Sequence, residues 1–421
     1  MSRRWKGSYL SYVVTFFFFY YCLSAFSSVL SVYLTQIGIG IADLSLIISS
    51  ASLFGFFLVP AAGYLSDRTG RPRQLCALLM VGFGIFALLF SASRAVGVLF
   101  LLHGISMSLL NAVMPVLERL AGAAKYRYGV LRIWGTVGYA AGAQMAGFIL
   151  QNLPSRFLFV SVLAAGCLAA VGIAGAEDPL AEKESETSGI TGVTGRTETT
   201  RIAATTGNAA APEGKSPEGK APKGLGYTVR TLTANHQYLL YLLIAFLFWG
   251  SSAVNMTYVP ILLTDLGVHT SVVGTILSVG TLVEIPLILF SNRFMDRFSS
   301  RTLVFFACGI TVVEFLTFGL TSSVAAVTVV IIFLKSIATT LFMMITLKTV
   351  RSLLPRELIT TGLSVVNTTN NIGLILLQNL GGRLLEKISL SSFYLILAGI
   401  ICCVMVLNLF LRAGYEGNVF E

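Results

Sequence analysis

The sequence GYLSDRTGRPR, Gly63–Arg73, is a short charged turn between two long stretches that are almost entirely apolar. A helix needs about 20 apolar residues to cross the hydrocarbon core of a bilayer, which is about 30 Å thick. Glycine, proline and charged side chains interrupt such a helix and favour a turn in water. The stretch therefore predicts two membrane helices joined by a loop outside the bilayer.

The same alternation of apolar stretches and polar loops runs along the whole chain of 421 residues, which is 55% hydrophobic and 11% charged. A soluble domain is about 25% charged, so this composition indicates a membrane protein. Twelve apolar stretches predict twelve transmembrane helices in an all-α fold. They are residues 9–34, 43–65, 73–92, 95–118, 128–151, 156–175, 238–263, 271–291, 302–320, 324–347, 358–380 and 391–411.

The 29 lysines and arginines are distributed unevenly around these stretches. With the N-terminus in the cytoplasm, sixteen lie at the two termini and in the loops after the second, fourth, eighth and tenth helices, but only four lie in the opposite loops. Positive charge gathers on the cytoplasmic side of membrane proteins, so both termini are predicted to be cytoplasmic. The net charge of +10 thus reports topology, and we expect no nucleic-acid partner.

One segment divides the chain into two halves. Residues 176–235 are rich in Thr, Gly, Pro, Glu and Lys, and such a composition cannot bury enough apolar surface to fold. We expect a six-helix bundle in residues 1–175, a mostly disordered cytoplasmic linker in 176–235, and a second six-helix bundle in 236–421. YLTQIGI (33–39) resembles LLTDLGV (262–268) at an offset of 229, so the bundles are predicted to be pseudo-symmetric repeats, as in secondary transporters.

The loop after the second helix resembles the signature G-x-L-S-D-R-x-G-R of the major facilitator superfamily. The matching residues are Gly63, Leu65, Ser66, Asp67, Arg68, Gly70 and Arg71. The resemblance implies that this loop is a cytoplasmic gate, in which the aspartate anchors a charge network that latches the two halves. A second copy, Asn292–Arg301, keeps Asp296 and Arg297 but lacks both glycines, so the second latch should be weaker.

A second resemblance concerns the fifth helix. YGVLRIWGTVGYA, Tyr128–Ala140, is similar to the fifth helix of lactose-permease-like and phenylpropionate-permease-like symporters, and Pro115-x-x-Glu118 matches a pattern of their fourth helix. The resemblance implies that Glu118 and Arg132 form a pair that binds substrate and that Tyr139 stacks on it. The two charges also fall at similar depth, where a charge faces a cavity or a partner. A purely structural ion pair, or an arginine reaching the interface, is the alternative.

The second half departs from the lactose-permease pattern, because the histidine and glutamate of its tenth helix have no counterpart here. Glu284, Glu314 and Lys335 are its ionisable residues inside predicted helices, and VEIPLILF (283–290) is more similar to the phenylpropionate-permease and nucleoside-symporter branch. A carboxyl group in the bilayer that alternates between a protonated state and a pair with Lys335 would couple protons to transport. Glu284 is the first choice for that role, and a structural role remains the alternative for both carboxyl groups.

Amides in the predicted helices suit a hydroxylated or aromatic ligand. Asn111, Asn255, Asn367 and Asn371 are the candidates for substrate binding. We expect proton-coupled uptake of a sugar, oligosaccharide, nucleoside or aromatic acid, and a drug-type efflux antiporter is the alternative. The sequence shows no nucleophile with a base, no phosphate loop and no metal cluster, so an enzyme, a cofactor and a metal are not expected. We expect a monomer in the cytoplasmic membrane of a bacterium.

A deletion tests the linker. Removing residues 182–222 should leave expression and transport nearly unchanged, because this segment has no apolar pattern to pack. Transport by the deleted protein in whole cells, normalised to its amount in the membrane, measures the effect. Loss of the folded protein from the membrane would contradict the prediction.

Overall fold

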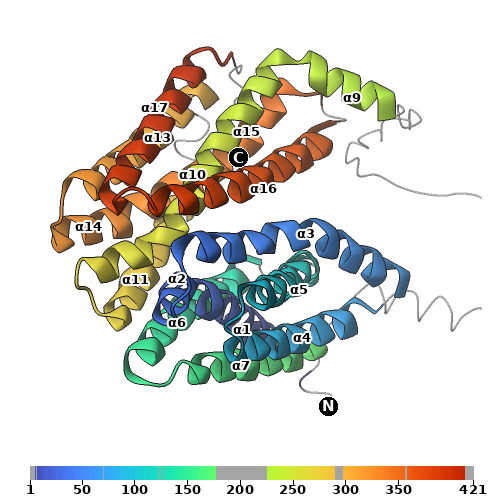
Figure 1. Cartoon of the computed structure of the whole chain (residues 1–421). Coiled ribbons are helices and arrows are strands. Elements are labelled where there is room, and N and C mark those ends of the chain that lie inside the picture. Colours follow the sequence, from blue (N-terminus) through green and yellow to red (C-terminus); the bar gives the residue numbers. More distant parts are fainter. Residues whose placement is uncertain are drawn as a thin grey trace, which may run out of the picture.

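The computed structural model describes residues 5, 7–69, 71–122, 124–126, 128–176, 225–289, 297–355 and 358–412. Every regular element in these residues is helical, and the helices form two bundles (Figure 1). The first bundle contains α1 (Tyr9–Ser27), α2 (Leu30–Gln36), α3 (Ile41–Thr69), α4 (Pro72–Ala92), α5 (Val96–Gly122), α6 (Tyr128–Asn152) and α7 (Arg156–Gly175).

The second bundle begins after a short helix, α9 (Leu225–Ala234), which lies within the segment expected to be linker. Residues 177–224 of that segment lie outside the described residues. The bundle contains α10 (His236–Asp265), α11 (Thr270–Leu289), α13 (Ser300–Leu320), α14 (Val324–Val330), a π-helical turn (Ile331–Lys335), α15 (Ser336–Leu353), α16 (Ile359–Leu385) and α17 (Leu390–Leu409).

Each of the twelve predicted stretches is helical, although two of them are interrupted. The first consists of α1 and α2, which join at Val29, and the tenth consists of α14, the π-helical turn and α15. Within the described residues, nine helical segments are long and apolar enough to cross a membrane. The prediction of an all-α membrane protein is confirmed, while the cytoplasmic placement of both termini stays a prediction.

The two bundles share the same glycine turn, which follows α2 in the first bundle and α10 in the second. Gly38 follows α2 with a φ of 87°, and Gly267 follows α10 with a φ of 85°. A positive φ of this kind favours glycine and closes a helix end. The hydrogen bonds match as well, because Ile39 N–H donates to Leu34 at 3.0 Å and Val268 N–H donates to Leu263 at 2.9 Å. The offset between these sites is the one found in the sequence.

Each bundle has an aromatic core of its own. In the first, Phe26 packs edge-on against Phe83 at 5.6 Å between ring centroids, and it stacks on His103 at 5.8 Å. His103 is buried, and its Nδ1 lies 3.0 Å from the Ser50 hydroxyl group. In the second, Phe248 of α10 stacks on Phe342 of α15 at 3.8 Å. The two cores make each bundle a packed unit.

Helix α6 packs closely on α1 because glycines line one of its faces. A Cβ added at Gly138 or Gly142 would overlap the backbone of α1, and one added at Gly135 would overlap the ring of Tyr20. Helices in lipid gain little from the hydrophobic effect, so close backbone approach and dispersion hold them together. The glycine stripe therefore determines how α6 sits in the first bundle.

The same helix also contacts the second bundle, at the predicted extracellular end. A Cβ added at Gly147 would come within 2.5 Å of the Thr270 carbonyl oxygen, and Gly274 is packed as tightly against α6. The Ser278 hydroxyl group donates to the Ala140 carbonyl oxygen at 2.7 Å. α6 and α11 thus form a closely packed contact between the halves.

A second contact between the halves joins α3 to α10 and α16. The hydroxyl groups of Ser45 and Tyr258 are hydrogen-bonded, and the Asn379 amide donates to the Ser49 hydroxyl group at 3.0 Å. An added Cβ at Gly382 would overlap Ser45. All of these residues lie toward the predicted extracellular ends of their helices, so the halves are closed at that end.

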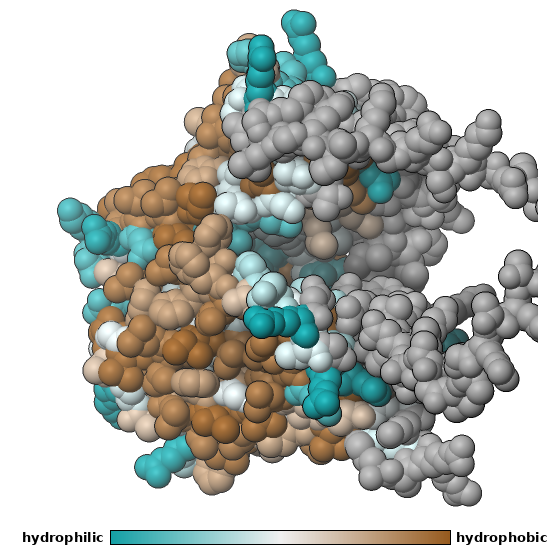
Figure 2. Space-filling view, turned by 90° about the vertical axis from the view of Figure 1, so that its right-hand side faces the viewer, coloured by the Kyte–Doolittle hydropathy of each residue, from teal (hydrophilic) through white to brown (hydrophobic). Residues whose placement is uncertain are grey.

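At the opposite end the halves separate. In Figure 1 the two bundles lie close together at the left, around α2, α6 and α11, and lie apart at the right. Figure 2 looks from that right-hand side and shows a hollow between the upper and lower bundles, bordered by hydrophilic residues. The structure is therefore closed at the predicted extracellular end and open at the predicted cytoplasmic end.

Replacing Gly274 by valine tests the closed contact. The added carbons have no room against α6, so the extracellular end should open. In a background without the six native cysteines, a cysteine at the buried Ser45 position should react with maleimide about tenfold faster, the change that about 1.4 kcal/mol of bias produces. Gly399→Val is the control, since no atom lies within 4 Å of a Cβ there. An unchanged rate would contradict the prediction.

Candidate functional site

Arg132 lies on α6, about one turn after the helix begins at Tyr128. Its guanidinium group stands over the ring of Tyr20, with Cζ 4.2 Å from the ring centroid. Gly135 leaves the room for this ring, which is 4% exposed. A cation over an aromatic face is a favourable contact. Tyr20 of α1 therefore supports the guanidinium group of Arg132.

The predicted partner of Arg132 is Glu118 on α5, whose side chain lies outside the described residues. The pairing of Glu118 with Arg132 stays a prediction. Tyr139, two turns further along α6, is partly buried and packs against the hydrophobic core. Its hydroxyl group lies within electrostatic range of Glu284 in the second bundle.

Glu284 is the residue at which charges from the two halves converge. It lies on α11 and is partly buried. The hydroxyl groups of Ser336 and Thr340 face its carboxyl group, and both Lys335 and Arg132 lie within electrostatic range of it. Lys335 belongs to the same half and Arg132 to the opposite half. The attraction of the Glu284 carboxylate to each of these cations grows as the cation comes closer, so a movement of the halves changes its interaction with Arg132.

Lys335 ends the π-helical turn that interrupts the tenth crossing. A π-helical turn rotates the following side chains relative to a regular helix and is frequent at functional sites. Lys335 lies within electrostatic range of both Glu284 of α11 and Glu314 of α13. The three ionisable residues predicted for proton coupling thus form one cluster.

Glu314 lies deepest in that cluster. It is 2% exposed on α13, and its Oε1 accepts a hydrogen bond of 2.7 Å from the side-chain amide of Asn255. Asn255, predicted as a substrate-binding residue, is 3% exposed and contacts this carboxyl group. The remaining predicted amides are accessible, since Asn111 on α5 and Asn367 and Asn371 on α16 are exposed.

Other polar side chains of the site were not predicted as site residues. Tyr20, Ser336 and Thr340 face the charged groups directly. Ser336 and Thr340 could have been found from their spacing, because side chains four residues apart share one face of a helix. The stacking of Tyr20 on Arg132 joins helices far apart in the sequence, and no local pattern indicates it.

The predicted gate residues are only partly described. Arg68, Arg71 and Arg297 are exposed. The Asp67 side chain, Gly70 and Asp296 lie outside the described residues. A Cβ added at Gly63 would meet no atom within 4 Å, so Gly63 makes no close approach while the cytoplasmic end is open.

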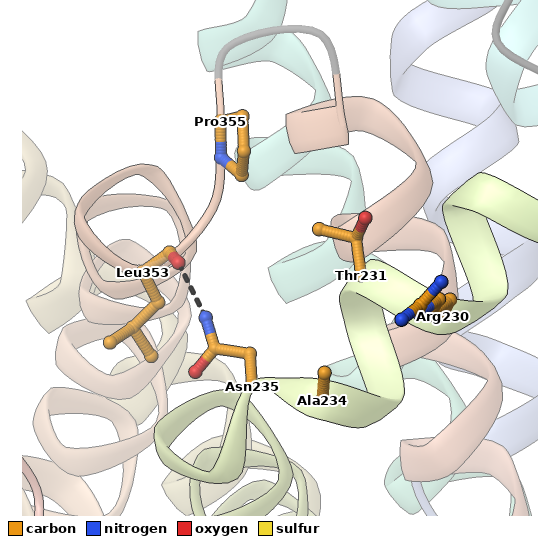
Figure 3. A pocket seen from close by; sticks show the side chains of 6 residues that line it. All are labelled: Arg230, Thr231, Ala234, Asn235, Leu353 and Pro355. Carbon is orange, nitrogen blue, oxygen red and sulfur yellow. Dashed lines mark hydrogen bonds between the residues drawn. The ribbon is translucent and has the colours of Figure 1, made fainter.

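A separate pocket of about 600 Å³ lies beside α9, at the predicted cytoplasmic end of the second bundle (Figure 3). Arg230, Thr231, Ala234, Asn235, Leu353 and Pro355 line it. The Asn235 amide donates to the Leu353 carbonyl oxygen at 2.8 Å and ties α10 to the end of α15. None of the predicted site residues lines this pocket, so it is distinct from the charged cluster.

Within the described residues, no group of His, Cys, Asp or Glu side chains could hold a metal ion.

Comparison with known proteins adds curated relatives and solved structures. The chain is 22% identical over 374 residues to the uncharacterized transporter YwbF of Bacillus subtilis, covering 87% of this chain and 84% of that protein. It is 22% identical over 428 residues to the maltose permease of Geobacillus stearothermophilus, covering 99% and 98%. The crystal structure of the nucleoside transporter NupG has the same fold, with a TM-score of 0.75 at 13% identity over 96% of this chain and 98% of that one.

Residues 9–410, nearly the whole chain, match the MFS_1 like family. The relatives and the neighbouring structure are transporters rather than enzymes. The fold, the hollow between two bundles and the charged cluster at their contact agree with this match. The chain is a multi-pass integral cell-membrane transporter and belongs to the MFS_1 like family of the major facilitator superfamily.

Proposed function

We propose that the chain is a proton-coupled symporter that takes up a small hydroxylated solute, a sugar, oligosaccharide or nucleoside. The observation that carries the proposal is that Glu284 lies within electrostatic range of both Lys335 of its own half and Arg132 of the opposite half. A change in the charge of Glu284 alters the attraction between the halves. Protonation is therefore linked to the movement that exposes the site to either side of the membrane.

Lys335 favours a proton over a metal cation as the coupling ion. Its ammonium group already interacts electrostatically with the two carboxyl groups, which a sodium ion would need as ligands. A second cation beside a buried ammonium group is repelled strongly in a medium of low dielectric constant. A proton added to a carboxyl group removes negative charge without bringing a separate cation into the site.

The substrate class follows from Arg132 and its surroundings. A guanidinium group over an aromatic ring offers paired donors that suit vicinal hydroxyl groups or a carboxylate. Glu118, Tyr139, Asn111, Asn367 and Asn371 complete our proposed substrate site. The maltose permease and the nucleoside transporter bear names of hydroxylated solutes, which supports the same class here.

The remaining parts of the proposal concern how the cycle is gated. The loop after α3, with Gly63, Asp67, Arg68, Gly70 and Arg71, would latch the halves when the cytoplasmic end closes, and Asp296 with Arg297 would form the weaker second latch. Residues 176–235 would connect the halves without taking part in transport.

The cluster from Arg132 to Glu314 is built from one chain, so we propose that a monomer transports.

Purified protein in liposomes that enclose a pH-sensitive dye tests the function. Maltose, raffinose, uridine and phenylpropionate are first screened for stabilisation of the protein, because a ligand that binds the folded state raises its apparent stability. Addition of the stabilising solute outside should then acidify the lumen as the solute enters. Alkaline change in the lumen indicates an antiporter, and uptake without any pH change indicates transport without protons. Either result would reject symport.

Arg132→Lys tests whether the guanidinium plane binds the substrate. Lysine keeps the charge but loses the paired donors, so affinity should fall at least about tenfold, as expected when about 1.5–3 kcal/mol of charged hydrogen bonding is lost. Direct binding to the purified variant measures this, with Arg94→Lys at an exposed loop position as the control. Affinity within about twofold of the parent protein would assign Arg132 a structural role.

A further inference from the structure

Asn255 and Glu314 form a polar pair inside the second bundle. The Asn255 amide nitrogen donates to Glu314 Oε1 at 2.7 Å, and the residues are 3% and 2% exposed. Asn255 comes from α10 and Glu314 from α13. The pair therefore links two helices of the second bundle.

Two atoms around this pair are buried and have no hydrogen-bond partner in the described structure. One is Oδ1 of Asn255, and the other is the hydroxyl group of Tyr394 on α17. Tyr394 is fully buried and lies within electrostatic range of Glu314. A buried acceptor without a donor costs about 1–3 kcal/mol, so such an atom calls for an explanation.

A proton on Glu314 supplies the donor that Asn255 Oδ1 lacks. A carboxylic acid and a primary amide are complementary, because each offers one donor and one acceptor. With Oε1 already accepting from the amide nitrogen, a hydroxyl group at Oε2 could donate to Oδ1 and complete a doubly hydrogen-bonded pair. A carboxylate at this place leaves Oδ1 without a donor and sets two acceptors beside each other.

The charged and titratable groups that face Glu314 come from the surrounding elements. Lys335 of the π-helical turn is the cation within range, Tyr394 faces it from α17, and α10 contributes the neutral Asn255. Beyond Lys335, Glu284 of α11 is the next acidic group. Lys335 thus has two carboxyl groups within range, and of these two Glu284 is the one in range of Arg132 of the opposite half.

We propose that Glu314 and Asn255 form the proton-binding site, and that Lys335 passes the protonation state of Glu314 on to Glu284. The inference rests on the proposed symport. It assigns the proton to Glu314, the inner carboxyl group, rather than to Glu284, the outer one. A proton from water adds to Oε2 of Glu314, and the new hydroxyl group donates to Asn255. Lys335 stays an ammonium ion and turns to Glu284. Release of the proton to water restores the pairing of Lys335 with Glu314.

This assignment explains how an inner group affects the contact between the halves. With Glu314 charged, Lys335 is shared between two carboxylates and Glu284 remains available to Arg132. With Glu314 protonated, Lys335 neutralises Glu284 and weakens its attraction to Arg132. Arg132 is then free to bind substrate. Proton binding inside the second bundle thereby favours substrate binding at the first.

Glu314→Gln is the decisive variant, because glutamine keeps the paired hydrogen bonds with Asn255 and imitates the protonated acid. In liposomes, solute-driven proton entry should fall at least about tenfold, while exchange of labelled for unlabelled solute should change less than about threefold. The melting temperature of the purified variant should equal or exceed that of the parent. Glu284→Gln should differ, since Lys335 then has no carboxylate to turn to once Glu314 is protonated, and this should impair exchange as well.

Comparing Asn255 with Asn408, another buried asparagine, separates a role in proton binding from a role in packing. Asn408 on α17 is fully buried, donates to the Arg301 carbonyl oxygen at 2.8 Å and also has an unpartnered Oδ1, but its recorded side-chain contact is a backbone group. Asn255→Leu should reduce solute-driven proton entry at least about fivefold at equal protein content, whereas Asn408→Leu should not. Equal effects of the two changes would overturn the special role of Asn255.

The outcomes distinguish this inference from the proposed function. If the parent protein moves no protons with its solute, the symport itself is wrong. If the parent protein moves protons and Glu314→Gln still does so within about twofold, the symport stands and the assignment to Glu314 is overturned. If Glu284→Gln alone abolishes proton entry while preserving exchange, the proton belongs to the outer carboxyl group and the inference is again overturned.

Discussion

The cost of charge inside a bilayer is the constraint on which the second bundle depends. A lysine in the middle of a membrane helix is tolerated when carboxyl groups or water surround it. Lys335 meets that condition with both Glu284 and Glu314 within electrostatic range. The π-helical turn before it and the partnership of Glu314 with Asn255 follow from the same need. These contacts therefore link α10, α11, α13 and the π-helical turn.

Helix α6 serves both bundles, which makes it the element through which they communicate. One face carries the glycines that pack on α1, and its last turns contact α11 of the opposite half. Arg132 lies at the other end of the same helix, near Glu284. A tilt of α6 relative to α11 would open one end of their contact while closing the other. Small residues allow such a movement because few side chains interlock.

Much of the fold could be predicted from the sequence because each membrane helix is a long apolar stretch of residues. The twelve stretches are helical, and the repeat offset leads from Gly38 to the matching turn at Gly267. The site was harder to predict. Asn255 was expected to face substrate, yet its environment depends on the rotation of α10 against α13, which no local pattern reveals. The stacking of Tyr20 on Arg132 likewise depends on the space at Gly135, more than a hundred positions further along the chain.

The polarity of α6 and α16 has a consequence for how the chain enters the membrane during its synthesis. Both helices are long enough to span but are not among the nine described segments that are also apolar enough to do so. Glycines account for this in α6, and asparagines and threonines account for it in α16. Insertion from the translocation channel depends on the apolarity of each segment. Both helices should therefore leave the channel together with earlier partners, α1 for α6 and α10 for α16, so that assembly begins before synthesis of the chain is complete.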